Sequence, residues 1–232
     1  MVNDQPMYDL LISDELLCLF SFKIPTILEK FGKIRSIDTP ISEEGITGVC
    51  LGMSLNKIYP IQTHIRSDFL LLATNQIMNL IAKYQYMFGG LYTVPMLIRV
   101  VIGRSWGQGA QHSQALQSFF MHVPGIKVVM PATPADAKGL LIGAINDKNP
   151  VMFIDDRWCY DETGSVTEDL SEIPLGKAEI LEQGEDITIV AFSYMVNEAL
   201  KASSVLRTKG INAEVINLRT IKPWDKELII KS

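Results

Sequence analysis

The sequence contains few residues that form disulfides or bind transition metals. It has three cysteines and three histidines among 232 residues. They are Cys18, Cys50, Cys159, His64, His112 and His122. The cysteines include no C-x-x-C pair, and the histidines include no pair at the spacing of zinc ligands. Zinc binding and dithiol chemistry are therefore not expected, and the cysteines are expected to be reduced thiols.

Long apolar runs and clusters of basic residues are also missing. The most apolar run, 69–73, is followed by three polar residues and is far shorter than the ~20 residues that a membrane span needs. The net charge is −5, whereas nucleic acid and acidic membranes usually bind a basic face. The N-terminus carries Asp4 and no basic lead of a secretory signal. We therefore expect a cytoplasmic protein that binds neither nucleic acid nor a membrane.

What the sequence does contain is a series of short apolar runs separated by helical patterns. The runs cover 59–65, 95–102, 127–130, 150–154, 187–192 and 212–218. Most are continuous rather than alternating, which is typical of parallel strands covered on both faces. Helices are expected at 44–57, 68–87, 113–121, 134–145 and 196–209, and another should begin at Pro223. The predicted fold is α/β, with a mostly parallel sheet between two helical layers.

A polar, acidic stretch interrupts this pattern between Asp155 and Gly176. We predict one unit over 1–165, a linker over 166–180 and a second unit over 181–232. The second unit has too few strands to complete a sheet. Its edge is expected to be covered by a partner, or the chain is a fragment.

Glu43 stands at the start of the first clear helix. It follows Asp38, Thr39, Pro40 and Ile41, with Ser42 as the expected N-cap. One interpretation is that the acid complements the helix dipole, worth about 0.3–1 kcal/mol. The other is that a half-buried glutamate shares a proton with a ligand nitrogen. The local sequence leaves both open.

Two glycine-containing motifs are weak signals. Residues 103–107 fit G-x-S-x-G after a strand, but a helix start is missing and the last histidine is His122, so the order serine, acid, histidine is not available. The partial dinucleotide motif has His112 where a third glycine should be. His112 follows a glycine-rich loop at a helix start, which favours contact with a ligand. His64 and His122 are expected to be structural or surface residues.

Six segments, in register from about Lys30 onward, carry a family resemblance. They are 38–43 (DTPISE), 86–90 (YMFGG), 109–114 (GAQHSQ), 124–129 (PGIKVV), 134–140 (PADAKGL) and 174–178 (PLGKA). The chain resembles the β subunits of thiamine-diphosphate-dependent 2-oxoacid dehydrogenases, the E1 component of pyruvate dehydrogenase-type complexes. The resemblance implies a transketolase-type pyrimidine-binding domain followed by part of a transketolase C-terminal domain.

The resemblance also implies roles for individual residues. Glu43 would hydrogen-bond N1′ of the cofactor's aminopyrimidine, and protonation there would help the cofactor's amino group remove the thiazolium C2 proton. Ile41, Ile65 and Phe69 would contact the pyrimidine, although Phe69 is equally compatible with a core residue. His112 would lie near the reacting end of the cofactor and assist transfer to the acceptor.

The implied cofactor and partners follow from the same family. The chain lacks the G-D-G…N motif for magnesium and diphosphate, so an α subunit would hold both in an α2β2 assembly, and a lipoyl-bearing E2 component would accept the acyl group. A loop containing Ala144, Ile145, Asp147 and Asn149 would hold a potassium ion, unless it is an ordinary turn. The small-molecule substrate would be a 2-oxoacid.

The sequence departs from the family in three places. Its N-terminal segment diverges, and the second domain stops at Ser232, about halfway through the family domain. His64 and Arg66 lie in a segment that differs from typical pyruvate dehydrogenase subunits; they line a pocket for an anionic substrate, or Arg66 is an exposed solubilising residue. Two other functions stay open: a transketolase- or acyloin-type two-carbon transfer, and a degenerate, non-catalytic subunit.

Overall fold

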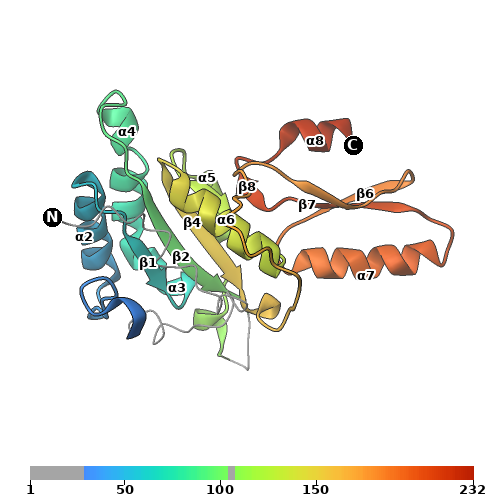
Figure 1. The fold of residues 1–232 in the computed structure, drawn as a ribbon, viewed down its shortest axis with the longest axis horizontal. Helices are drawn as coiled ribbons and strands as arrows, with labels where there is room; N and C mark the ends of the chain where they lie inside the picture. Colours follow the sequence, from blue (N-terminus) through green and yellow to red (C-terminus); the bar gives the residue numbers. More distant parts are fainter. Residues whose placement is uncertain (1–28, 104–107) are drawn as a thin grey trace.

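The structure is a computed structural model that describes residues 29–103 and 108–232 (Figure 1). Cys18 and the divergent N-terminal segment lie outside the described residues. The same holds for 104–107 of the G-x-S-x-G motif.

The larger sheet has five strands in the order β1-β2-β4-β3-β8. The first four in this order are parallel, and β8 pairs antiparallel with β3. The strands are β1 (Ile61–His64), β2 (Met96–Ile102), β3 (Lys127–Val129), β4 (Pro150–Asp156) and β8 (Thr220–Lys222). The predicted α/β class with a mostly parallel sheet is confirmed.

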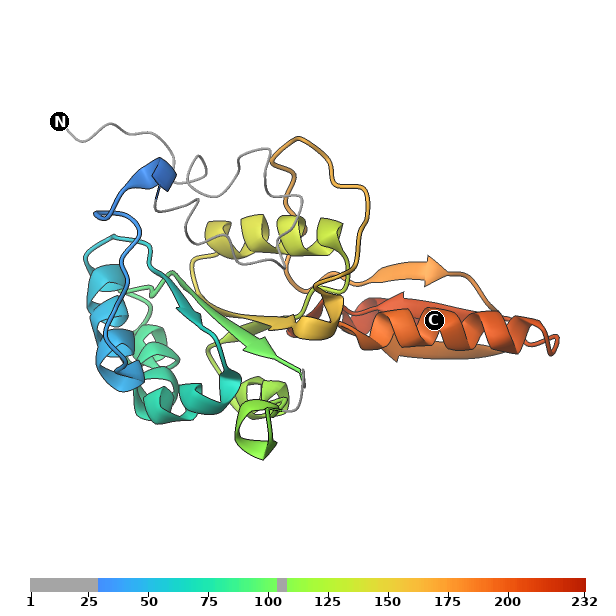
Figure 2. The same cartoon turned by 90° about the horizontal axis from the view of Figure 1, so that it is seen from below.

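Helices cover both faces of this sheet, as Figure 2 shows. Helix α6 (Pro134–Asn146) lies on one face. The other face carries α2 (Glu43–Leu55), α3 (Ser67–Leu70) and α5 (Gln117–His122). Two buried apolar layers result, one on each side of the strands.

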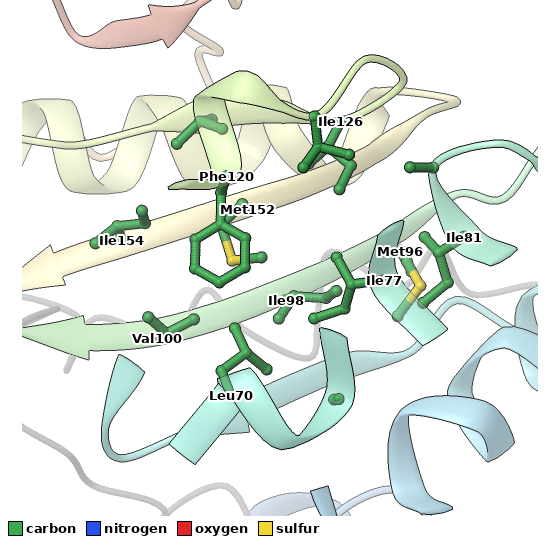
Figure 3. Packing of buried hydrophobic residues seen from close by; sticks show 14 of the residues in the cluster. Leu70, Ile77, Ile81, Met96, Ile98, Val100, Phe120, Ile126, Met152 and Ile154 are labelled. Atoms are coloured by element: carbon green, nitrogen blue, oxygen red, sulfur yellow. The ribbon is translucent and has the colours of Figure 1, made fainter. Parts of the chain in front are cut away.

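Successive residues of β2 contribute to opposite layers. Ile98 packs with Leu70 and Phe120 in the layer drawn in Figure 3. The neighbouring Leu97 packs with Leu140 of α6 on the other side. Because both faces of the strand are buried, an alternating polar pattern is not needed, and the run is apolar except for Arg99. Each fully buried side chain of this kind stabilises the fold by roughly 1.5–3 kcal/mol.

The start of α6 agrees with the sequence prediction. Thr133 Oγ1 accepts a hydrogen bond from Asp136 N at 3.1 Å, and Asp136 Oδ2 accepts one from Thr133 N at 3.3 Å. Pro134 occupies the first turn, where its missing N–H costs nothing. This capping box fixes the point at which the chain enters the helix.

The prediction of one continuous α-helix over 68–87 is wrong, because the main-chain hydrogen bonding changes along this segment. The segment is divided into α3, a 3-10 turn η3 (Leu71–Ala73), a π-helical turn η4 (Gln76–Ile81) and α4 (Tyr84–Met87). A tight turn followed by a wide one keeps Leu70, Ala73, Ile77 and Ile81 on one buried face. The apolar spacing therefore predicted the buried face but not the change of helix type.

The helix expected over 113–121 begins later. A single turn, η5 (Ala110–His112), comes first, and α5 follows at Gln117. The segment between them is tied to α3, because Ser67 Oγ donates to Gln114 O at 3.0 Å and Gln114 N donates to Asp68 Oδ1 at 3.2 Å. These side-chain bonds use main-chain groups that a longer helix would require.

A smaller sheet follows, with the strand order β5-β7-β6. Its strands are β5 (Glu179–Glu182), β6 (Ile187–Ala191) and β7 (Ala213–Asn217), and helix α7 (Met195–Arg207) packs against them. Strand β6 is an edge strand on which Ile187 is 51% and Val190 43% exposed. The second unit is thus a three-stranded sheet with an exposed edge strand.

Three details of the C-terminal part differ from expectation. Strands β5 and β8 were not predicted, since both are short and pair with segments far away in the sequence. The last helix, α8 (Lys226–Lys231), begins after Pro223, because Asp225 is its N-cap and accepts a hydrogen bond from Leu228 N at 3.2 Å.

Within the described ranges, no helix is long and apolar enough to cross a membrane.

Candidate functional site

The candidate site lies at the carboxyl ends of three neighbouring parallel strands. Strand β1 ends at His64, β2 at Ile102 and β4 at Asp156. Ligands of open α/β sheets bind at this edge, because the strand ends and following loops leave a crevice there. Helix α3 begins directly after β1, so Phe69 is carried to the same edge.

The backbone of Glu43 is fixed to β1 through two hydrogen bonds. Thr47 Oγ1 donates to Glu43 O at 2.6 Å, and Gln62 Nε2 of β1 donates to Thr47 Oγ1 at 2.8 Å. Thr47 is fully buried, and Glu43 is half-buried. Ser42 occupies the N-cap position, but its side chain makes no capping hydrogen bond to any described residue. The anchoring of Glu43 therefore comes from Thr47 and Gln62 and not from the expected Ser42 cap.

His64 lies close to Glu43. Burial lowers the pKa of His64, and the negative charge of Glu43 raises it in part. Its Nε2 is buried and has no hydrogen-bond partner among the described residues. The expectation of a satisfied structural histidine is therefore wrong for this nitrogen. A neutral imidazole with a free ring nitrogen beside a carboxylate is suited to a polar ligand.

Phe69 and His112 form the second close pair of expected site residues. Their ring centroids are 5.1 Å apart with an interplanar angle of 71°, an edge-on contact. The bonds between Gln114 and the Ser67–Asp68 pair hold the two segments in this position. Phe69 is 39% exposed, so its ring is only partly used by the core. This exposure favours the ligand-contact interpretation of Phe69 over the core one.

Ile41 and Ile65 are placed on the surface of the molecule. Ile41 is 95% and Ile65 66% exposed. Exposed apolar side chains beside a half-buried glutamate suit a site that a second chain or a flat ring covers. Their predicted contact with the pyrimidine stays a prediction. His122 is exposed at the end of α5, in agreement with its expected surface role.

An ion pair between neighbouring strands was missed by the sequence analysis. Arg99 of β2 binds the fully buried carboxylate of Asp155 of β4. Burial raises the pKa of Asp155 to about 6, while the charge of Arg99 and its hydrogen bond lower it in part. The pKa of Tyr160 is also raised, first by burial and then by Asp155. Charged residues inside otherwise apolar strands were the available signal for this pair.

Arg66, Gln108 and Arg157 form a cationic cluster at the same edge. Gln108 Oε1 accepts hydrogen bonds from Arg66 Nη2 at 2.5 Å and from Arg157 Nη1 at 2.9 Å. Arg66 is half-buried, so the expectation of an exposed solubilising arginine is wrong. Gln108 and Arg157 were missed by the sequence analysis. The position of Arg157 directly after a parallel strand could have indicated it.

The loop expected to hold potassium already has other partners. Ala144 O accepts a hydrogen bond from Tyr59 Oη at 3.0 Å. The carboxylate of Asp147 pairs with Lys127 and accepts hydrogen bonds from Asn149 N and Nδ2 at 2.8 Å. Ile145 is buried in the apolar layer beside α6. An ammonium group beside the loop opposes a second cation, so these residues do not fit a potassium ion.

The residues fit the pyrimidine half of thiamine diphosphate. A carboxylate, an aromatic ring and a buried ring nitrogen without a partner provide the polar and stacking contacts that a heteroaromatic ring needs. The part of the chain that the structure describes contains no group of three or more His, Cys, Asp or Glu residues that could hold a metal ion. These residues therefore offer no carboxylate cluster for magnesium.

Curated relatives with similar sequences are named as β subunits of enzymes. The chain is 42% identical over 206 residues to "Acetoin:2,6-dichlorophenolindophenol oxidoreductase subunit beta" of Bacillus subtilis, covering 89% of this chain and 60% of that protein. It is also 42% identical over 206 residues to "Pyruvate dehydrogenase E1 component subunit beta" of Rickettsia bellii, covering 89% and 63%. The chain thus spans about 60% of the length of these relatives.

Solved structures with the same fold are transketolases. "Split gene transketolase, inactive beta4 tetramer" matches with a TM-score of 0.74 and 25% identity, over 88% of this chain and 64% of that one. A transketolase of Pichia stipitis in complex with sedoheptulose-7-phosphate matches with a TM-score of 0.60 and 23% identity, over 79% and 26%. The second likeness shows the fold alone.

Two family models cover most of the chain. The model described as "Transketolase, pyrimidine binding domain" matches residues 21–161. The model described as "Transketolase, C-terminal domain" matches residues 176–232. The strand order, the anchored glutamate and the aromatic pair are thus found in a chain that belongs to the transketolase pyrimidine-binding domain family.

Proposed function

We propose that this chain acts as the β subunit of a thiamine-diphosphate-dependent 2-oxoacid dehydrogenase E1. The enzyme decarboxylates a 2-oxoacid and transfers the acyl group to lipoyllysine. The single observation that carries this proposal is Glu43, half-buried beside His64 and held there by Thr47 and Gln62. The 42% identity to pyruvate dehydrogenase E1 β subunits supports the reaction class.

The roles of the chain's own residues follow from their positions. When bound, thiamine diphosphate supplies the carbon nucleophile for the keto group and a positively charged ring that accepts the electrons released with CO2. Glu43 holds a proton at the pyrimidine nitrogen N1′, and Phe69 packs on the pyrimidine ring. His112, whose ring lies against Phe69, exchanges a proton with the acyl acceptor.

A second subunit is part of the proposal. An α subunit binds magnesium and the diphosphate, and the active assembly is α2β2, with the E2 lipoyl domain as acceptor. The exposed Ile41 and Ile65 beside the glutamate support a covering chain. The likeness to the solved "Split gene transketolase, inactive beta4 tetramer" supports the need for a second subunit.

A second candidate substrate comes from the acetoin relative, which is as similar as the pyruvate dehydrogenase subunits. Cleavage of a 2-hydroxyketone such as acetoin uses the same cofactor chemistry, with an aldehyde leaving in place of CO2. An assay with both substrate classes separates the two candidates. CO2 release with 2-oxoacids supports the first candidate, and acetaldehyde release from acetoin supports the second.

The test compares two adjacent glutamates in the complex with the α subunit. Glu43→Gln removes the proposed proton site, whereas Glu44→Gln changes an exposed acid whose Oε1 accepts a hydrogen bond from Gln76 at 2.8 Å. We expect Glu43→Gln to lower kcat by about 100-fold or more and Glu44→Gln to change it less than about threefold. Calorimetric binding of thiamine diphosphate is the second readout. Equal activity of both variants, or no turnover of any 2-oxoacid by a formed wild-type complex, contradicts the proposal.

A further inference from the structure

Two arginines from different strand ends meet at one oxygen atom. Arg66 follows β1, and Arg157 follows β4. Since β2 lies between these strands, the two side chains approach from opposite sides of its end. Gln108 Oε1 accepts from both guanidinium groups, at 2.5 and 2.9 Å. A neutral amide oxygen thus occupies the point at which an anionic oxygen would be bound by two guanidinium groups.

The charge of Arg66 is not neutralised by any described carboxylate. Its other described partner is the carbonyl of Ile65, at 2.9 Å. Its Nε is buried and has no hydrogen-bond partner in the described part of the chain. A buried N–H of a guanidinium group without an acceptor is costly, which favours a site that is completed by a ligand.

Three acidic side chains at this edge have other partners. Asp155 is paired with Arg99, and Asp68 accepts a hydrogen bond from Gln114 N. Asp156 accepts one from Trp158 N at 3.0 Å, and burial raises the pKa of Asp156. None of the three forms an ion pair with Arg66 in the residues that the structure covers. The positive charge of Arg66 therefore remains at the strand ends.

We infer that Arg66 and Arg157 bind an anionic group of the substrate, with its oxygen replacing Gln108 Oε1. The inference rests on the proposed function, because it names the substrate class of that same site. Planar guanidinium groups suit carboxylate and phosphate oxygens alike. Arg66 is close in sequence to Phe69, whose ring contacts His112, so the anionic group is placed beside the expected reaction centre.

The bound group is a distal one and not the carboxylate that leaves. Decarboxylation moves negative charge away from the leaving carboxylate. Two guanidinium groups on that carboxylate would stabilise the substrate more than the transition state and slow the reaction. An anionic group that the product retains carries the same charge throughout, so its binding does not oppose the chemical step. The substrate class is therefore 2-oxoacids with a second carboxylate or a phosphate.

The experiment uses the complex with the α subunit and two matched substrate pairs. 2-Oxoglutarate and 2-oxopentanoate have the same chain length and differ in a distal carboxylate. Phosphohydroxypyruvate and hydroxypyruvate differ in a phosphate. We expect kcat/KM to be at least about tenfold higher for the anionic member of one pair, and the pair that shows the preference distinguishes carboxylate from phosphate.

Variants test which residues cause the preference. Arg66→Gln and Arg157→Gln should lower kcat/KM about 10- to 100-fold, mainly through KM, for the substrate with the distal anionic group. They should change it less than about threefold for the substrate that lacks this group. Gln108→Glu keeps both arginines but supplies an internal carboxylate, so it should cause the same selective loss. Arg207→Ala, on the distant helix α7, is the control. The inference is overturned if an arginine variant lowers kcat/KM equally for both substrates of a pair.

A binding measurement separates this inference from the proposed function. Calorimetric titration of the complex with glutarate and with inorganic phosphate requires no turnover. Arginine-dependent binding of either anion by a complex that turns over no 2-oxoacid supports the anion site and contradicts the proposed function. Turnover of both members of each pair with equal kcat/KM supports the function and overturns the inference. Failure of both anions to bind, together with no turnover, overturns both.

Discussion

The carboxylate of Asp136 accepts a hydrogen bond from Arg219 Nε at 2.6 Å, which joins the first turn of α6 to the turn between β7 and β8. Asp136 is fully buried, and its Oδ2 also accepts from Asn217 Nδ2 at 2.7 Å. Arg219 pairs in addition with Glu179 of β5. One buried carboxylate therefore connects the larger sheet with the smaller one.

Replacement of Asp136 by alanine should strongly destabilise the fold. It leaves Arg219 and Asn217 without their buried acceptor and removes one half of the capping box, so we expect a loss of about 3–5 kcal/mol in the free energy of unfolding. Arg207→Ala, which breaks an exposed pair with Glu182, should cost less than about 1 kcal/mol. Urea unfolding followed by circular dichroism measures both. A cost below about 1 kcal/mol for Asp136→Ala would contradict the expectation.

Thr47 should position Glu43 for its role. Thr47→Val keeps the side-chain shape but leaves the amide of Gln62 without its acceptor and releases the carbonyl of Glu43, so a loss of about 1–3 kcal/mol is expected. Activity of the complex should fall roughly tenfold or more, because small displacements of catalytic groups are costly. Thr47→Ser retains the hydroxyl, so its stability and activity should be close to those of the wild type. Activity loss in Thr47→Val without rescue by Thr47→Ser would count against positioning through this hydroxyl.

Asp155 should make stability depend on pH in a defined direction. Its pKa is about 6 in the folded protein, above the ordinary 3.8 expected after unfolding, so the folded state binds the proton more tightly. This tighter proton binding stabilises the folded state by on the order of 2–3 kcal/mol. The stabilisation is complete below about pH 4 and is lost as the pH rises to about 6.

The measurement compares wild type with Asp155→Asn. The stability difference between the two proteins in urea unfolding should decrease from pH 4 to pH 6.5 and stay constant above that. Asp155→Asn removes the titration but leaves Arg99 with a neutral acceptor. A difference that does not change with pH, or that increases with pH, is incompatible with a raised pKa.

Cys50 and Cys159 should be unreactive in the folded protein. Burial raises the pKa of Cys50 to about 11 and that of Cys159 to about 12, so neither is a thiolate at pH 8. Iodoacetamide at pH 8 should leave both unlabelled in native protein and label both in urea, as mapped by mass spectrometry. Rapid labelling of either thiol without denaturant would show that its surroundings open more readily than this packing allows.

Local sequence signals predicted those features that depend on neighbouring residues. Thr133, Pro134 and Asp136 specify the start of α6 because all three act within one turn. The run of β2, apolar except for Arg99, predicts a strand buried on both faces. The buried face of 70–81 was predicted as well, but its change from a 3-10 turn to a π-helical turn was not, because apolar spacing does not specify which main-chain groups pair.

Only part of the site was predicted, because only some of its residues are marked by local motifs. Glu43 and His112 were found from motifs; the effect of the Glu43 charge on His64 and the ring contact of His112 with Phe69 agree with a shared edge of the sheet. The meeting of Arg66 with Arg157 depends on β1 and β4 lying on either side of β2, an order that a linear sequence does not encode locally. The same applies to β8, whose partner strand β3 lies far upstream.

The pairing of β8 with β3 has a consequence for dissecting the protein. A recombinant fragment that stops at the acidic stretch would lack β8, although β8 supplies the last strand of the larger sheet. The main chain of β3 would then become an open sheet edge, and Asp136 would lose its basic counterion. Such a fragment should precipitate or form mixed oligomers, so the two parts of this chain are best expressed as one polypeptide.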